Sequence, residues 1–258
     1  VPKVVGGETR LCGELAALCY QAIFDRVVAV SSRQSAEMVK LLENTFRAIN
    51  IGLVNEVALM CDRLGLDVWE VIEAAATKPY GFMKFLPGPG LGGHCIPVDP
   101  TYLAWKMKSL NFPARFIELA TEINGQMPHH VVDKVAAILN QAKRAVNGSR
   151  ILILGVAYKP DVSDVRESPA LDVIRLLCER GGEVAYHDPH VAEVAIEDRV
   201  HKSVEPGDGL LAGSDLVVVL THHTAIDYQR VVDLAPGVFD TRNATRDVLR
   251  GRERVRKL

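Results

Sequence analysis

The chain has 258 residues, of which 48% are hydrophobic and 24% charged, and its formal net charge is −2. This is ordinary globular composition, with enough chain for two domains that each bury a core. A general nucleic-acid binder would be basic, and no apolar run approaches the roughly 20 residues needed to span a bilayer, so we expect neither nucleic acid nor membrane as a partner.

The five cysteines are odd in number, widely spaced and never arranged as C-x-x-C. This pattern favours free thiols in a reducing compartment over disulfides or zinc sites. No signal-peptide pattern follows Val1, and we therefore expect a cytoplasmic protein. The lack of an initiator methionine predicts a fragment or a processed chain.

Two short strands are predicted near the N-terminus, in "PKVVGG" and in "DRVVAVSS" (residues 25–32). They have no predicted partners in the following helical region. We therefore interpret residues 1–32 as the end of an N-terminal domain whose sheet lies outside this sequence.

A long helix is predicted next, because apolar residues recur at intervals of three and four from Met38 to Met60. Ser35 is a plausible N-cap and Gly65 a plausible stop. About thirty residues at 1.5 Å each give a helix of about 45 Å, long enough to cross a domain or subunit boundary. Shorter helices follow up to residue 146, and we expect residues 33–146 to form a helical domain that dimerises through the long helix.

From about residue 150, short apolar strands alternate with helices, beginning with "RILILGVAY" and "SPALDVIRLLCERGG". This alternation predicts a parallel sheet flanked by helices over residues 147–258. Ligands of such sheets bind beyond the carboxyl ends of the strands. The first strand is not followed by G-x-G-x-x-G, so an ordinary dinucleotide site is not expected there. The basic tail, Arg246 to Lys257, is predicted to be a frayed end, with phosphate contact as the alternative.

The segment "GPGLGGHCIPVDP" (residues 88–100) places a thiol, Cys95, on a loop rich in glycine and proline. Most free cysteines are small buried hydrophobic residues, but glycines let a ligand approach the backbone closely and favour a functional thiol here. Asp99 could orient a base or a water molecule. His94 is expected to be a loop hydrogen-bonder, since neighbours on an extended turn point apart.

Lys40 and Asn44 lie four residues apart and share one face of the long helix. They could point together at a developing oxyanion, although a solvated lysine is the ordinary alternative. The pairs His129–His130 and His222–His223 lack the i,i+4 spacing of a helical metal site, so no metal is assigned.

Three segments resemble the UDP-glucose/GDP-mannose dehydrogenase family: "AEMVKLLENTFRAINIGLVNE", "FLPGPGLGGHCIPVDPTYLAWK" and "GVAYKPDVSDVRESPALDVI". The resemblance runs from about Lys3 to Arg246. Within the family, "GGHCIPVDP" is similar to the enzymes that act on UDP-N-acetylhexosamines, UDP-N-acetylglucosamine 6-dehydrogenases in particular. The mannosamine enzymes tend to have alanine in place of Pro97.

The resemblance implies oxidation of a sugar C6 alcohol to a carboxylate with two NAD+ and no release of the aldehyde. Cys95 would be the nucleophile that forms a thiohemiacetal and then a thioester. Lys40 and Asn44 would stabilise the C6 oxyanion, and Asp99 would assist proton transfer or activate water.

The resemblance also implies a set of binding residues. The loop that carries Phe85, Leu86, Gly90, Gly92 and Gly93 would wrap the nucleotide sugar. Lys159 would reach the substrate, and Arg115 is a weaker candidate that would reach it across a homodimer. Arg242 would lie towards the cofactor or the pyrophosphate. Arg166 and Glu167 are interpreted as a structural pair at a helix start.

The chain departs from the family because it contains no G-x-G-x-x-G domain for NAD. We therefore expect the isolated chain to lack dehydrogenase activity. One alternative is a UDP-sugar-binding, dimerising module without catalysis. Another is a thiol hydrolase that uses Cys95 and His94, which is disfavoured because no oriented third group is evident.

Overall fold

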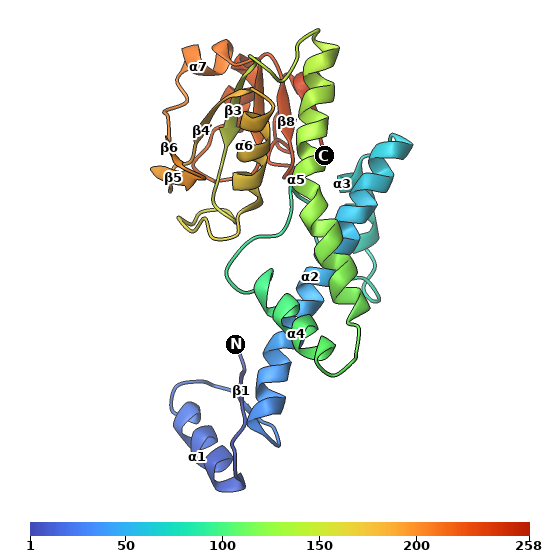
Figure 1. Cartoon of the computed structure of the whole chain (residues 1–258), viewed down its shortest axis with the longest axis vertical. Coiled ribbons are helices and arrows are strands. Elements are labelled where there is room, and N and C mark those ends of the chain that lie inside the picture. Colours follow the sequence, from blue (N-terminus) through green and yellow to red (C-terminus); the bar gives the residue numbers. More distant parts are fainter.

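A computed structural model describes residues 1–258 and shows an elongated molecule, with a small N-terminal unit at one end and a parallel sheet at the other (Figure 1). The N-terminal unit contains β1 (Lys3–Val5), α1 (Arg10–Gln21) and β2 (Val27–Ala29). The two strands pair in parallel, which confirms both predicted strands. Helix α1 buries none of its side chains. Because two strands alone form a marginal sheet, this unit offers an open edge and an uncovered helix face for packing.

The central axis is α2 (Arg33–Leu64), a helix of 32 residues. Its stop at Gly65 is confirmed, since Gly65 adopts a left-handed φ of 70°. The predicted N-cap at Ser35 is wrong. The Ser32 side chain accepts a hydrogen bond from the Ser35 backbone N–H, so the helix begins three residues earlier than the apolar pattern indicated.

Three further helices pack around α2: α3 (Val68–Ala76), α4 (Val98–Lys108) and α5 (Arg115–Gln141). Helices α2 and α5 approach closely at Gly52, where an added Cβ would lie 3.2 Å from the Ala120 Cα. Near this crossing, the buried amides of Asn55 and Asn124 hydrogen-bond at 2.8 Å. Asn55 Oδ1 also accepts from the Gly88 N–H at 2.9 Å. The helix pair therefore holds the start of the cysteine loop.

The C-terminal part is a five-stranded sheet in the order β4-β3-β7-β8-β9, and every neighbouring pair is parallel. Its strands are β3 (Arg150–Leu154), β4 (Glu183–His187), β7 (Leu216–Val219), β8 (Val238–Asp240) and β9 (Val255–Lys257). The helices on this part of the chain are α6 (Pro169–Glu179), α7 (Asp208–Gly213) and α8 (Tyr228–Leu234). A hairpin of β5 (Glu193–Ile196) and β6 (Arg199–Lys202) lies beside β4. The predicted parallel sheet flanked by helices is confirmed.

Successive side chains of β3 point into two different cores, because side chains alternate across a strand. Ile151 and Ile153 pack in a large core that includes α5 and α6, whereas Leu152 and Leu154 pack in a smaller core with α7 and α8. The large core also contains Trp69 of α3 and therefore joins the helical region to the sheet. The division at residues 1–32, 33–146 and 147–258 is retained as a proposal.

The basic tail differs from its prediction. It ends in a 3-10 turn (Arg252–Arg254) and in β9, which pairs with β8 at the edge of the sheet. Lys257 is fixed further by an ion pair with Asp67, at 3.1 Å between Nζ and Oδ2. The tail is therefore an ordered edge strand rather than a frayed end. None of the helices combines the length and apolar character required to cross a bilayer.

Candidate active site

The loop that carries Cys95 connects α3 to α4 and lies between the central helices and the sheet. Gly93 has a φ of 102°, and its N–H donates to the Arg166 carbonyl at 3.0 Å. A Cβ on Gly92 would lie 2.7 Å from the Glu167 carbonyl oxygen, too close for any side chain. The glycines thus allow the loop to run against the segment between β3 and α6. Cys95 is partly exposed, directly before the first turn of α4.

Lys40 and Asn44 meet Asp99 of α4. Asp99 Oδ2 accepts from Lys40 Nζ at 3.0 Å and from the Asn44 amide at 2.6 Å. The hydrogen bond with Asp99 raises the pKa of Lys40, and the nearby Cys95 acts in the same direction. The structure therefore brings together all four residues expected to be catalytic, with a cation held near the thiol.

The sequence predicted that the His94 side chain points away from the Cys95 thiol, and this prediction is wrong. Its Nδ1 lies 3.5 Å from Cys95 Sγ, within hydrogen-bonding range for sulfur. The backbone bends at these residues and is not extended, so the alternation expected of an extended turn does not apply.

Arg166 belongs to the same neighbourhood, but its partner is not Glu167. It forms a bidentate pair with Asp164, with 2.6 Å between Nη2 and Oδ2. Glu167 has a left-handed φ of 52°, which turns its side chain away from this pair into a cavity described below. The predicted Arg166–Glu167 pair is therefore wrong. The bond to Asp164 raises the pKa of Arg166, and Cys95 contributes in the same direction.

Arg242 lies where the end of β8 meets the loop. An added Cβ on Gly88 would lie 2.2 Å from Arg242 Nη1, so a larger residue there would displace the guanidinium. Arg242 Nε donates to the Leu220 carbonyl at 2.9 Å, but the guanidinium has no carboxylate partner. Desolvation lowers the pKa of Arg242 to about 10, although Asp240 opposes the shift. A half-buried cation without an anion is suited to binding an anionic ligand.

The other predicted binding residues are more dispersed. Phe85 packs edge-on against Phe46, at 5.7 Å between ring centroids, while Leu86 is exposed. Lys159 lies over the Tyr158 ring, whose edge contacts Gly93. Gly90 has a φ of 142° and packs on Pro169. Arg115 is not brought to the thiol: it begins α5 and lines a separate apolar hollow with Phe112 and Phe116.

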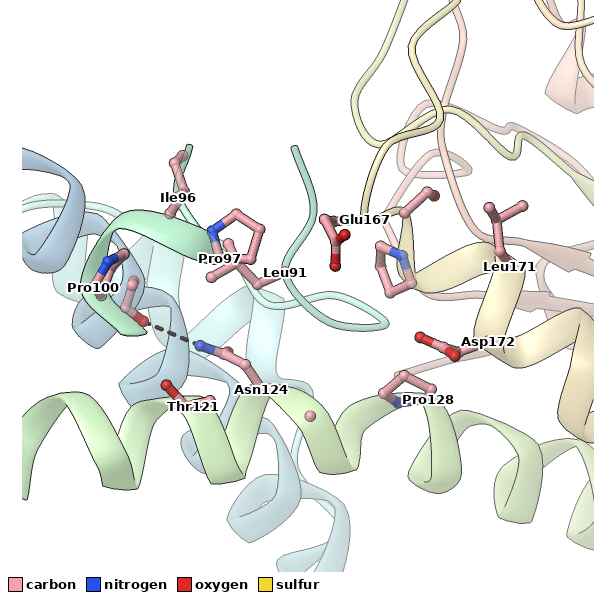
Figure 2. Close-up of a pocket in the computed structure, with 14 residues that line it drawn as sticks. Leu91, Ile96, Pro97, Pro100, Thr121, Asn124, Pro128, Glu167, Leu171 and Asp172 are labelled. Atoms are coloured by element: carbon pink, nitrogen blue, oxygen red, sulfur yellow. Dashed lines mark hydrogen bonds between the residues drawn. The ribbon is translucent and has the colours of Figure 1, made fainter. Parts of the chain in front are cut away.

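A cavity of about 500 Å³ lies on the other side of the loop. Figure 2 shows Ile96 and Pro97 at one side of it, and Glu167 and Asp172 at the other. Neither Cys95 nor Lys40 lines this cavity. It is therefore a hollow behind the cysteine loop and not the space in front of the thiol.

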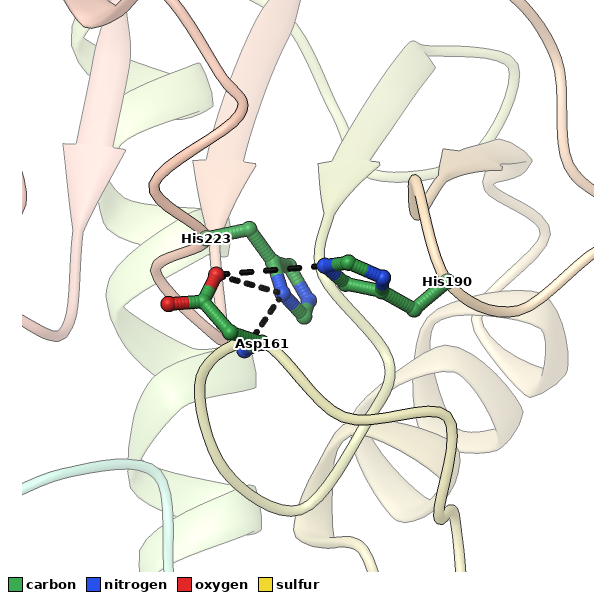
Figure 3. Close-up of side chains that lie close together, drawn as sticks. All are labelled: Asp161, His190 and His223. Carbon is green, nitrogen blue, oxygen red and sulfur yellow. Dashed lines mark hydrogen bonds and ion pairs between the residues drawn. The ribbon is translucent and has the colours of Figure 1, made fainter.

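Sequence spacing did not reveal a second polar cluster, which contains Asp161, His190 and His223 (Figure 3). Buried His223 contacts Asp188 Oδ2 through Nε2 at 3.0 Å, and its Nδ1 accepts from the Asp161 N–H at 3.0 Å. Because both ring nitrogens are engaged, His223 has no free lone pair for a metal. The cluster instead links the loops after β3, β4 and β7.

Asp188 is the centre of this network. Its Oδ2 accepts from the N–H groups of Val156 and Ala157, at 2.7 and 3.0 Å, directly after β3. Burial opposes ionisation of Asp188, but the bonds from His223 and from these N–H groups outweigh it, and the pKa of Asp188 is lowered. The carboxylate therefore stabilises the fold above the pH at which it titrates in the unfolded chain, about 4. This stabilisation is lost as the pH falls through the lower folded-state pKa.

We expect Asp188→Asn to lower the free energy of unfolding by about 2 kcal/mol near neutral pH, because two buried donors and a histidine lose a charged acceptor. Asp208→Asn is the matched control, since the exposed Asp208 carboxylate pairs only with Arg230; its loss should be about 0.5 kcal/mol. Denaturant unfolding measures both, and the Asp188 effect should shrink below about pH 4. Equal losses in the two variants would contradict this role.

The helical region and the sheet region of the chain match two domains of one protein family. Residues 34–126 match the central domain of the UDP-glucose/GDP-mannose dehydrogenase family, and residues 152–247 match its UDP binding domain. The UDP-N-acetyl-D-mannosamine dehydrogenase of Methanococcus maripaludis is 38% identical over 250 residues, which are 93% of this chain and 55% of the relative. The NDP-N-acetyl-D-galactosaminuronic acid dehydrogenase of Ralstonia solanacearum is 36% identical, over 86% of this chain and 50% of the relative.

Solved structures give the same result. The UDP-D-ManNAc dehydrogenase of Pyrococcus horikoshii superimposes with a TM-score of 0.83 at 30% identity, covering 94% of this chain and 56% of that one. The UDP-N-acetyl-mannosamine dehydrogenase Cap5O of Staphylococcus aureus gives 0.78 at 32% identity, with coverages of 99% and 59%. The chain thus spans between 50% and 59% of the length of these relatives. It belongs to the UDP-glucose/GDP-mannose dehydrogenase family, of which it carries the central and UDP-binding domains.

Proposed function

We propose that this chain carries the thiol and the UDP-sugar site of an NAD-dependent dehydrogenase that oxidises the C6 alcohol of a UDP-N-acetylhexosamine to the uronate. One observation carries the proposal: a glycine loop places Cys95 beside Lys40 and Asp99, while Gly88 of the same loop packs on the unpaired Arg242. A reactive thiol and an anion-binding cation therefore share one segment.

Arg242 is proposed to bind the diphosphate of the nucleotide sugar. Its Nη donors have no carboxylate partner, and the glycine beneath them permits close approach of a ligand. Two or more charge-assisted hydrogen bonds would repay the desolvation of the guanidinium. The sequence left open whether Arg242 serves the cofactor or the pyrophosphate, and its position beside the cysteine loop supports the substrate's pyrophosphate.

Cys95 is proposed to capture the C6 aldehyde as a thiohemiacetal, which is oxidised to a thioester and then hydrolysed. Covalent capture retains the reactive aldehyde between the two oxidations. Lys40 and the Asn44 amide stabilise negative charge at the C6 oxygen. Asp99 is held by both of these groups and is placed to orient them and the hydrolytic water.

The family depends on NAD, but the sheet of this chain does not fit a dinucleotide. Asp188 already occupies the N–H groups directly after β3, where such a cofactor binds in ordinary dinucleotide folds. The next helix, α6, begins only at Pro169. NAD+ supplies the two hydride acceptors that the oxidation needs, and we propose that its main site lies outside these 258 residues.

The configuration of the sugar is the finer part of the proposal. The "GGHCIPVDP" loop favoured UDP-N-acetylglucosamine, whereas the relatives named above are mannosamine and galactosaminuronic acid enzymes. These names support a UDP-N-acetylhexosamine and favour the manno epimer over the gluco epimer.

We also propose that the active form is a homodimer that joins through α2. Met38, Leu42 and Leu53 of α2 are exposed, as are Tyr102 and Trp105 of α4. Large apolar side chains gathered on neighbouring helices are typical of an interface. Arg115 of α5 lines a hollow with Thr45 and Ile49 of α2, which is consistent with a role across the dimer.

Calorimetry and an NAD+ reduction assay test the proposal on the isolated chain. We expect it to bind UDP-N-acetylmannosamine but not NAD+, and to produce no NADH. Robust NADH formation by the isolated chain would contradict the absence of an NAD site. Failure of the chain to bind any UDP-sugar would contradict the proposed substrate site.

The alternative of a binding module without catalysis makes a different prediction. The same UDP-sugar binding would occur, but the chain joined to an NAD-binding domain would still produce no uronate. The Lys40–Asp99 pair beside Cys95 favours catalysis, because a module that only binds UDP-sugar has no need of a cation and a carboxylate at a thiol.

A further inference from the structure

The ring of His94 lies against the thiol of Cys95, with Nδ1 3.5 Å from Sγ. From this contact we infer that His94 is the base that takes the Cys95 proton, so that the two neighbours form a catalytic pair. The inference rests on the proposed function, in which Cys95 is the nucleophile. A thiol needs such a partner, because the thiolate and not the thiol attacks a carbonyl.

The other polar groups at the thiol cannot take its proton as readily. Lys40 is a cation with no free lone pair, and its ammonium group is bound to Asp99. The Asp99 oxygen Oδ2 accepts from both Lys40 and Asn44. Arg166 stays protonated in proteins. Among these groups, His94 alone offers a nitrogen lone pair within hydrogen-bonding range of Sγ.

The surrounding charges favour the ion pair that proton transfer creates. Cys95 contributes to raising the pKa of both Lys40 and Arg166, so both cations lie near enough to stabilise a thiolate. Asp164 lies near His94. The pKa of Asp164 is lowered to about 2, mainly by its hydrogen bonds with Arg166 and to a smaller extent by His94. A thiolate at Cys95 would thus have cations beside it, and an imidazolium at His94 would have a carboxylate beside it.

The titratable and charged groups that face the pair are Lys40 on α2, Asp99 on α4, and Tyr158, Lys159, Asp164 and Arg166 on the segment between β3 and α6.

The proposed step is an addition of the thiol to the aldehyde, and it changes no oxidation state. His94 Nδ1 takes the proton from Sγ, and the thiolate forms a bond to the aldehyde carbon while the carbonyl π pair moves to oxygen. The imidazolium then returns the proton to that oxygen, which gives the neutral thiohemiacetal and neutral His94. Lys40 stabilises the transient oxyanion.

The pH dependence of Cys95 alkylation tests the pair on the chain without substrate. Iodoacetamide labelling of each cysteine would be followed by peptide mass spectrometry in the parent, His94→Asn and His94→Gln. Exposed Cys19 is the internal reference, and His129→Asn, an exposed histidine on α5, is the matched control. His94 is itself exposed, so both substitutions should leave the fold intact.

We expect labelling of Cys95 near pH 7 to slow by about 10-fold in both His94 variants, and its pH midpoint to rise by about one unit. Cys19 and the His129→Asn protein should be unchanged. Superimposable Cys95 profiles in the parent and both variants would overturn the inference. Calorimetry with UDP-N-acetylmannosamine on the same samples separates the two claims. If the Cys95 profiles of parent and variants coincide while the parent binds the UDP-sugar, the His94–Cys95 pair alone is rejected. If the profiles differ as expected but the parent does not bind the UDP-sugar, the proposed function is rejected.

Discussion

Replacing Cys95 by serine should abolish uronate formation by the enzyme completed with its NAD-binding domain. A serine hydroxyl beside Lys40 and Asp99 is a far weaker nucleophile than a thiolate, so the aldehyde is not captured and the second oxidation has no covalent intermediate. Loss of a nucleophile of this kind lowers turnover by about 10⁴-fold or more. Chromatography of the UDP-sugar products, together with NADH absorbance, would measure the effect.

Cys19→Ser is the control for this experiment, because Cys19 is an exposed thiol of α1 in the N-terminal unit. It should leave uronate formation unchanged. Calorimetry should also show that Cys95→Ser still binds the UDP-sugar, since the thiol is not proposed to hold the nucleotide. Ordinary uronate yields from Cys95→Ser would show that the thioester scheme is wrong.

Replacing Arg242 by methionine should weaken binding of UDP and of the UDP-sugar by about 100-fold, because two or more charge-assisted hydrogen bonds to the diphosphate are lost. Methionine keeps an unbranched apolar stem at this position but removes the guanidinium, and circular dichroism should show that the fold of the variant is unchanged. Arg242→Lys should recover only part of the affinity, since lysine cannot make the bidentate contact.

Arg246→Met is the matched control for Arg242. Arg246 lies four residues further along the same loop, is exposed, and pairs with Asp247 at 3.2 Å. Its loss should change the UDP dissociation constant less than about 2-fold, because exposed ion pairs are weak and screened. If the two variants bind UDP equally well, Arg242 does not hold the diphosphate.

Much of the fold was predictable because its local patterns have clear periods. The three- and four-residue spacing from Met38 to Met60 predicted α2, and the apolar runs after residue 150 predicted the parallel sheet. The convergence of Lys40 and Asn44 was predictable too, since i,i+4 residues share a helix face. Asp99 was predicted as a helper of Cys95, but its bonds to Lys40 and Asn44 were not predicted.

The other parts of the fold and of the site depend on contacts between distant segments, which cannot be predicted from the periodicity of the sequence. The links of His223 to Asp188 and Asp161 join three separate loops. The tail became β9 because the open edge of β8 was available to it. Neither the Arg166–Asp164 pair nor the contact of His94 with Cys95 follows from spacing, because each depends on a local bend of the backbone.

The central claim is that Cys95 and Arg242 belong to one UDP-sugar site, and protection of Cys95 from iodoacetamide tests it most directly. Peptide mass spectrometry would follow the labelling of Cys95 as UDP-N-acetylmannosamine is added to the parent chain and to Arg242→Met. The account predicts saturable protection of Cys95 in the parent, and a concentration requirement about 100-fold higher in the variant. Labelling of Cys95 at an unchanged rate when the parent is saturated with bound UDP-sugar would contradict it.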